Sequence, residues 1–150
     1  MKIQINVSDE NFQEVKERLL AAGFEIDDDG EFIISEKSIS KPYIMVKNND
    51  GEKVKLLTDD IIFLESFGHS VVIHACDGNN YQSSERLYKF SDGLDSTKFL
   101  RVSNCAIISK AHVKKIKPTF SMKYILTMSD GSLVDVTRSY YPIFKEFFGI

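Results

Sequence analysis

Three polar side chains, Arg101, Ser103 and Asn104, interrupt a mainly apolar stretch that runs from residue 99 to residue 109. The apolar flanks have the composition of buried strand, so we expect the polar side chains to be held at the surface between them. Guanidinium, hydroxyl and amide groups are donors and acceptors that suit the phosphates and base edges of nucleic acids. This stretch therefore favours nucleic-acid binding over catalysis.

The charge of the chain is unevenly distributed, although its net value of -3 alone would argue against a nucleic-acid-binding protein. Residues 1–50 carry 6 Lys and Arg against 11 Asp and Glu, residues 51–100 carry 5 against 8, and residues 101–150 carry 8 against 3. The basic excess thus accompanies the polar stretch. Because salt screens electrostatic fields over about 10 Å, a local basic surface is sufficient to attract phosphates.

Length and composition exclude several classes of protein. A chain of 150 residues, 43% of them hydrophobic, can form one domain plus a small appendage. No apolar run is long enough to span a membrane, and residues 1–6 alternate in polarity instead of forming a signal-peptide core. The two cysteines, Cys76 and Cys105, indicate no disulfide framework. We expect a cytoplasmic protein without membrane insertion, cofactor or small-molecule substrate.

The first 40 residues predict a small βαβ-like segment. Alternating apolar residues favour a strand at 2–7, and Ser8 is a suitable N-cap for a helix that ends near Gly23. A partner strand is expected at 31–35. The acidic residues 27–30 between these elements lack the alternating ligand spacing of an EF-hand loop, so we interpret them as a solvated turn.

From residue 41 onward, short strands alternate with turn signals, which predicts an α+β protein that is mostly β. The expected strands are 43–47, 52–57, 61–65, 71–75, 81–83, the stretch 99–109, 113–117, 123–128 and 132–136. A short helix is expected at 85–90. A final helix would have Ser139 as its N-cap, with Ile143 and Phe144 among the residues facing inward. We expect two parts, at 1–40 and 41–150.

The order of motifs from residue 43 to residue 150 resembles the LytTR-type DNA-binding domain of bacterial transcription regulators. The resemblance rests on Asp60-Ile61-Ile62-Phe63-Leu64-Glu65-Ser66, Val71-Val72-Ile73-His74, the stretch 99–109, Val113-Lys114-Lys115-Ile116, Asp130-Gly131 and Val136-Thr137-Arg138-Ser139-Tyr140. It implies an elongated arrangement of small antiparallel β-sheets with short helices, in which loops enter successive major grooves. As a short chain without an expected N-terminal phosphoacceptor domain, it resembles the stand-alone members of the family.

Carried over residue by residue, the resemblance implies three DNA-facing loops, at 68–70, 103–104 and 137–138. Arg138 would contact guanine or a phosphate, Asn104 would contact adenine or a phosphate, and His69 would donate to a phosphate or a base acceptor. Further contacts, mainly to phosphates, would come from Ser70, Arg101, Ser103, Lys114, Lys115 and Lys117. The chain departs from the family pattern at Asn104, Cys105 and Ser109, where many members have a basic residue, Ser and Asn, so the base preference is not inherited.

Each of these residues also has a structural alternative. His69 could be an ordinary exposed loop residue, and Asn104 could stabilise a turn through its own backbone. Arg138 could pair with Asp135 or Asp130, and Arg101 could be an ion-pair partner within a strand. These alternatives remain open at the level of the sequence.

The sequence offers little indication of a metal site or of a catalytic site. His74 and Cys76 would lie on one face of a strand, with Asp77 nearby, but three groups without a second cluster do not make a typical zinc site. A packed histidine and a buried thiol are the better interpretation. No Ser-His-Asp arrangement, phosphate-binding glycine loop or paired-carboxylate motif stands out, so we expect no enzyme activity.

The leading hypothesis is a cytoplasmic transcription regulator that binds double-stranded DNA through loops of a β domain, as a homodimer on repeated sites. The alternative is a non-catalytic protein-interaction module of a signalling system without DNA binding, which the net charge of -3 favours. A third possibility is an OB-type single-strand binder, which requires surface aromatic residues on a sheet. The acidic N-terminal segment could mediate self-association, sense a partner, or only pack on the domain.

Overall fold

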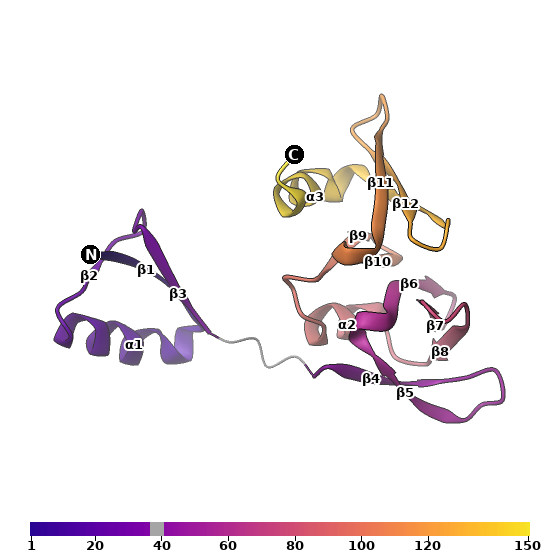
Figure 1. The fold of residues 1–150 in the computed structure, drawn as a ribbon, viewed down its shortest axis with the longest axis horizontal. Coiled ribbons are helices and arrows are strands. Elements are labelled where there is room, and N and C mark those ends of the chain that lie inside the picture. The colour runs from indigo at the N-terminus through magenta and orange to yellow at the C-terminus, as the bar shows by residue number, and fades with distance from the viewer. Residues whose placement is uncertain (37–40) are drawn as a thin grey trace. The chain divides into compact units, whose positions relative to one another are not determined.

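The computed structural model describes residues 1–36 and 41–150 (Figure 1). The chain divides into two compact units, Met1–Ile39 and Ser40–Ile150. The boundary expected at residue 40 falls outside the described residues. No helix in the described ranges is both long enough and apolar enough to cross a membrane.

The first unit has the βαβ arrangement expected from its sequence. Strand β1 (Lys2–Asn6) is followed by helix α1 (Asp9–Ala21), the short strand β2 (Glu25–Ile26) and strand β3 (Phe32–Ser35). The sheet order is β2-β1-β3, and β1 pairs in parallel with both neighbours. Strand β2 was not expected, because two residues are too short for a periodic pattern. Among residues 1–36, Ile3 is the only buried side chain.

Glu36 connects the end of β3 to the start of α1. Ser8 occupies the N-cap position as expected, but its hydroxyl donates to the Glu36 Oε1 atom at 2.9 Å instead of capping the helix. Asn11 also donates to this carboxylate, and these hydrogen bonds, led by that of Asn11, lower the pKa of Glu36. The carboxylate therefore links the end of β3 to the first turn of α1 through the Ser8 N–H and hydroxyl and the Asn11 side chain.

The second unit contains a seven-stranded antiparallel sheet of order β5-β4-β8-β7-β6-β10-β9. Its strands are β4 (Tyr43–Lys47), β5 (Lys53–Leu57), β6 (Ile61–Phe67), β7 (Ser70–Ala75), β8 (Asn80–Ser83), β9 (Phe99–Ser103) and β10 (Ala106–Ser109). Helix α2 (Leu87–Gly93) connects β8 to β9, close to the expected position. The chain thus crosses from one part of the sheet to the far edge through this helix.

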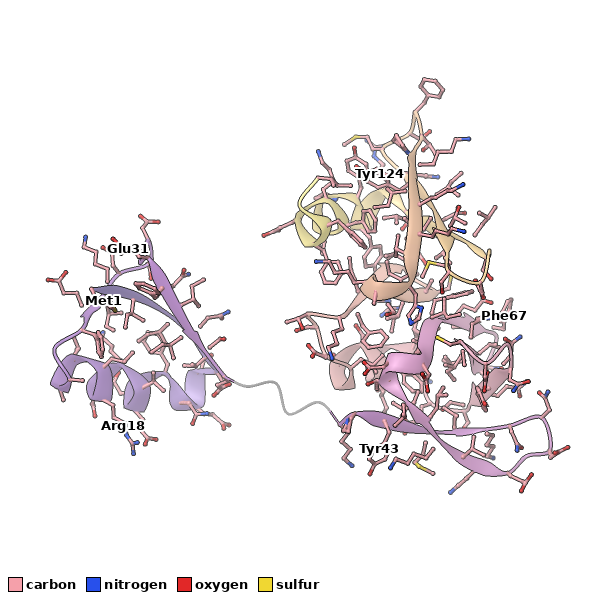
Figure 2. The ribbon with its side chains drawn as sticks, in the orientation of Figure 1. Met1, Arg18, Glu31, Tyr43, Phe67 and Tyr124 are labelled. Atoms are coloured by element: carbon pink, nitrogen blue, oxygen red, sulfur yellow. The ribbon has the colours of Figure 1, made fainter. Side chains whose placement is uncertain are left out.

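A second sheet of three antiparallel strands, β11 (Val113–Pro118), β12 (Tyr124–Met128) and β13 (Leu133–Val136), follows in the chain. Helix α3 (Tyr141–Phe148) lies against it, and Tyr124 on β12 is labelled in Figure 2. The Tyr124 ring stacks on the Tyr141 ring with centroids 4.9 Å apart. Phe144 of α3 is fully buried, as expected, whereas Ile143 is 52% exposed and does not face inward.

Two hydrophobic clusters form the core of this unit, and β6 contributes to both. Ile61 and Leu64 belong to the cluster that packs with α2, whereas Ile62 and Phe63 belong to the cluster that contains the three-stranded sheet and α3. All four side chains are buried. A central strand covered on both faces is expected to be continuously apolar, as the sequence of β6 is.

The stretch 99–109 forms a hairpin, not a single strand. Strands β9 and β10 pair with each other, and Asn104 and Cys105 form the turn between them. The C-terminal helix also starts later than expected, because a short 3-10 helix, Arg138–Tyr140, precedes it and places Tyr140, not Ser139, at the N-cap. Pro142 lies in the first turn of α3, where its missing N–H costs no hydrogen bond.

Candidate nucleic-acid interface

Hydrogen bonds bring together the three loops that the sequence singles out. The backbone N–H of Ser66, at the end of β6, donates to the Cys105 carbonyl at 2.8 Å, so the β6–β7 turn lies next to the β9–β10 turn. The N–H of Thr137 donates to the Val102 carbonyl on β9 at 3.0 Å, which places the segment after β13 along the same hairpin. The second turn lies at 104–105, one residue later than the expected 103–104, because Ser103 still belongs to β9. The loops at 68–70, 104–105 and 137–138 therefore lie at one edge of the second unit.

The β6–β7 turn presents His69 to solvent. Gly68 has a φ of 56°, a left-handed conformation that glycine adopts without steric cost. The Ser70 hydroxyl donates to the Phe67 carbonyl at 3.3 Å and so helps to close the turn. Phe67 is 58% exposed and marks the end of β6 in Figure 2. His69 is exposed and Ser70 is half-buried, so the turn offers an imidazole at its tip.

Arg101 holds the β9–β10 turn in place. Its Nε atom donates to the Ser103 carbonyl at 3.1 Å, and its Nη2 atom donates to the Asn104 carbonyl at 2.7 Å. The side chain is half-buried. Arg101 therefore has a structural role through main-chain carbonyls, and the ion pair considered as an alternative is not found within residues 1–36 and 41–150. The remaining N–H groups and the positive charge stay available at the edge of the loops.

Ser103 is not at the surface, and the expectation that it would be exposed is wrong. Its side chain is buried, and its hydroxyl oxygen accepts a hydrogen bond from the Cys105 N–H at 3.2 Å. The Ser103 Oγ atom also lies 3.4 Å from the Cys105 Sγ atom. The hydroxyl thus stabilises the turn from inside, as serine hydroxyls commonly do beside a tight turn.

Asn104 is exposed at the tip of the hairpin. Its side-chain oxygen, Oδ1, accepts a hydrogen bond from the Tyr140 hydroxyl at 3.3 Å, across 36 positions of sequence. The side-chain NH2 group is left as the donor. Sequence patterns did not indicate a role for Tyr140 beyond packing, because nothing local in the sequence connects it to the hairpin.

Arg138 is exposed at the start of the short 3-10 helix. Within residues 1–36 and 41–150, the ion pairs closer than 4.0 Å are Lys2–Asp27, Arg18–Glu14, His74–Glu65 and Lys98–Asp59. Arg138 takes part in none of these, so the pairing with Asp130 or Asp135 is not found. Asp130 instead accepts hydrogen bonds from the N–H and hydroxyl of Ser132.

Lys114 and Lys115 are exposed on β11, away from the three loops within the smaller sheet. Val113, at the start of β11, pairs with Met128 at one end of β12, whereas Val136, two residues before Arg138, pairs with Tyr124 at the other end. The two lysines therefore lie toward the opposite end of this sheet from Arg138. The structure does not bring them together with His69 and Asn104.

The residues considered for zinc form no such site. His74 stacks on Phe63 with ring centroids 4.0 Å apart, and its Nε2 atom lies 2.7 Å from the Glu65 Oε1 atom, so it is a packed histidine as expected. Cys76, however, is exposed, contrary to the expected buried thiol. Partial desolvation and the nearby Asp60 carboxylate raise the pKa of Cys76, which disfavours a reactive thiolate. No group of three metal-ligating side chains gathers in the described ranges.

Comparisons with known proteins identify the family and the fold of the second unit. The model of the LytTr DNA-binding domain family matches residues 51–149. A solved LytTr DNA-binding domain from Bacillus cereus superposes with a TM-score of 0.69 at 23% sequence identity, covering 74% of this chain and 100% of that one. The mostly β fold of the second unit is therefore the fold of that domain.

Relatives with regulatory names share the same region. Sensory transduction protein LytR of Staphylococcus saprophyticus is 24% identical over 116 residues, which are 77% of this chain and 45% of the relative. Sensory transduction protein LytT of Bacillus subtilis is 30% identical over 97 residues, or 64% of this chain and 40% of the relative. The chain thus spans less than half the length of these two relatives. With the family model covering most of its second unit, the chain belongs to the LytTr DNA-binding domain family.

Proposed function

We propose that this chain binds double-stranded DNA sequence-specifically and regulates transcription in the bacterial cytoplasm. The observation that carries the proposal is the gathering of the loops at 68–70, 104–105 and 137–138 at one edge, through the hydrogen bonds from Ser66 to Cys105 and from Thr137 to Val102. Each loop presents a different exposed side chain with hydrogen-bonding groups. Side chains of this kind can contact base edges when the loops enter a major groove.

The proposed roles differ along the edge. His69, Asn104 and Arg138 are exposed and would contact bases or the phosphates beside them. Arg101 and Ser70 would mainly shape the turns and add charge or a hydroxyl near the backbone of the duplex. Ser103 has no place in this set, because its hydroxyl is buried in the turn.

Lys114 and Lys115 would act as a separate group that attracts phosphates without sequence preference. Their place on β11 means that they would touch a different part of the duplex from His69. Two copies of the chain on repeated sites would place two sets of loops on one duplex, and simultaneous binding would raise the overall affinity. We therefore propose a homodimer on DNA.

Fluorescence anisotropy with duplex DNA from the region upstream of its own gene tests the proposal. The affinity is expected to fall as salt rises, because bound phosphates release counterions. The Arg138→Ala variant should lose about 1–3 kcal/mol of binding to the specific site, the usual contribution of a bidentate contact, with little change in melting temperature.

The matched control is Lys53→Ala, which removes the same charge from an exposed position on β5, at the opposite edge of the sheet from β9. It should leave specific binding nearly unchanged. Absence of salt-dependent binding to any duplex would refute the proposal and favour the protein-interaction module. Equal losses of binding and of thermal stability in Arg138→Ala would assign Arg138 a structural role.

A further inference from the structure

An open cavity of about 690 Å³ lies beside the β6–β7 turn. His69 and Ser70 line it from the turn, Arg101 lines it from β9, and Ser84 and Arg86 line it from the segment between β8 and α2. It therefore connects two of the loops proposed to face DNA with a segment that the sequence did not single out. Nothing in the sequence pattern marked Arg86, because it stands alone in a segment without a basic run.

The charge and hydrogen-bonding groups of this cavity suit an anion. Two guanidinium groups line it, with one carboxylate, Glu85, on the same wall. Arg101 already donates through Nε and Nη2 to the carbonyls of the hairpin, so it supplies charge more than free donors. Arg86 is exposed and belongs to none of the ion pairs found in residues 1–36 and 41–150. Its fork of N–H donors matches the geometry of phosphate oxygens.

The backbone around Arg86 is anchored by the core. Leu87, the next residue, is 5% exposed and Phe90 is 6% exposed, and both pack in the hydrophobic cluster with β6. Arg86 itself has an extended conformation directly before α2. The side chain is therefore carried on a fixed piece of backbone next to the His69 turn, which limits the conformational entropy lost when it binds.

We propose that this cavity receives a backbone phosphate of the bound duplex and that Arg86 is the residue that contacts it. The inference rests on the proposed function and adds a contact to it. When His69 approaches a major groove, the phosphates that border the groove come next to its turn, and the cavity is the basic recess on that side. Arg86 thus sets the position of the domain on DNA without reading sequence.

The test compares Arg86→Ala with the matched control Lys89→Ala, which removes a charge from an exposed position of α2 that does not line the cavity. Binding to the specific duplex and to an unrelated duplex is measured from 50 to 300 mM salt. For Arg86→Ala, both affinities should fall by the same factor, roughly tenfold at low salt. The slope of log K against log salt should become shallower by about 0.9, the value for one lost phosphate contact.

Arg86→Lys, which keeps the charge but not the fork, should retain most of the slope, and melting curves show whether each variant is folded. Wild-type binding with an unchanged slope in Arg86→Ala would overturn this inference and leave the proposed function intact. A loss limited to the specific duplex would also overturn it, because it would make Arg86 a base contact. Failure of the wild-type chain to bind any duplex would overturn both proposals.

A second experiment uses inorganic phosphate, because a free anion and a backbone phosphate could occupy the cavity through the same chemistry. Up to 10 mM phosphate, at constant ionic strength, is expected to leave the melting temperature of the wild-type chain unchanged. A saturable stabilisation by phosphate that Arg86→Ala abolishes, together with an unchanged duplex slope, would assign the cavity to a free anion instead of DNA.

Discussion

At the scale of single residues, the most specific arrangement is the hydrogen bond from the Tyr140 hydroxyl to the Asn104 side-chain oxygen. A bidentate contact of asparagine with adenine needs the side-chain oxygen as acceptor and the NH2 group as donor. In this chain the Tyr140 hydroxyl occupies one of the two lone pairs of the oxygen and so restricts the orientation of the amide, with the NH2 group left to donate. Of the two contacts expected from the sequence, adenine or a phosphate, this orientation favours those that need only a donor, such as a phosphate.

The Tyr140→Phe variant removes this constraint. We expect its relative affinity for duplexes with adenine at the contacted position to rise by up to about 1–3 kcal/mol, because the Asn104 amide becomes free to turn both its oxygen and its NH2 group toward one base. The measurement is competition binding with duplexes that differ at a single base pair. The control, Tyr43→Phe, removes a hydroxyl from β4, outside the three loops. Identical base preferences in the wild type and Tyr140→Phe would contradict the assigned role.

The three polar residues of the 99–109 stretch show that residue type alone does not predict which side chains are exposed. Arg101, Ser103 and Asn104 were expected to share one surface role, but of the three only Asn104 is exposed. Arg101 donates to two main-chain carbonyls and Ser103 accepts from a main-chain N–H. The side chains of Arg101 and Ser103 thus make the hydrogen bonds that main-chain groups of the turn require. Which main-chain groups need such partners can be known only from the geometry of the turn.

At the scale of elements, the turn between β7 and β8 depends on one carboxylate. The Asp77 Oδ2 atom accepts from the Tyr81 hydroxyl at 2.5 Å, and its Oδ1 atom accepts from the Asn79 N–H at 2.8 Å. These hydrogen bonds, led by that of Tyr81, lower the pKa of Asp77, and the same carboxylate raises the pKa of Tyr81. The turn is therefore stabilised while Asp77 is ionised.

Acid should remove this stabilisation. Because the folded-state pKa of Asp77 is lowered, its contribution is fully present above the unfolded-state value of about 3.9 and is lost as the pH falls through the lower folded value. Asp77→Asn should lower the urea midpoint at pH 7, and its difference from the wild type should shrink at and below pH 3. Tyr81→Phe should show a smaller effect of the same kind. A difference that is constant from pH 7 to pH 2 would contradict this account.

The terminal helix shows what an amphipathic pattern can and cannot predict. Phe144 is fully buried and packs against Tyr124 with ring centroids 5.1 Å apart, as the apolar spacing indicated. Ile143, its neighbour, is 52% exposed. A run of adjacent apolar residues cannot all lie on one face of a helix, and the position of the face is decided by the sheet that covers it.

At the scale of the whole molecule, the buried clusters belong to one unit. The two clusters consist of residues between Val46 and Phe144, whereas Ile3 is the only buried side chain of residues 1–36. A unit of fewer than about 40 residues rarely buries enough surface to fold alone. We therefore propose that residues 41–150 fold autonomously and that residues 1–40 do not fold as an isolated peptide.

The fragment 41–150 is accordingly expected to melt cooperatively with a midpoint close to that of the full chain, because it contains all members of both clusters. A peptide of residues 1–40 should show little secondary structure in water. Circular dichroism measures both. A fragment 41–150 that fails to fold, or a peptide that melts cooperatively as a monomer, would contradict the proposed division.

The sequence by itself determined where most strands and turns lie and which family the chain resembles. Alternation of apolar residues and the turn residues between them act over a few positions, so strands such as β4, β7 and β12 follow from local pattern. The fold of the second unit confirms that resemblance.

Only the tertiary structure decided which polar side chains share a surface. The contacts from Tyr140 to Asn104 and from Ser66 to Cys105 join residues that are tens of positions apart. They depend on the placement of β10 between β6 and β9, and sheet order is not encoded in local periodicity. That order also brought Arg86 to the cavity beside His69, whereas the hydrogen bonds of Arg101 and Ser103 were decided by the geometry of the β9–β10 turn.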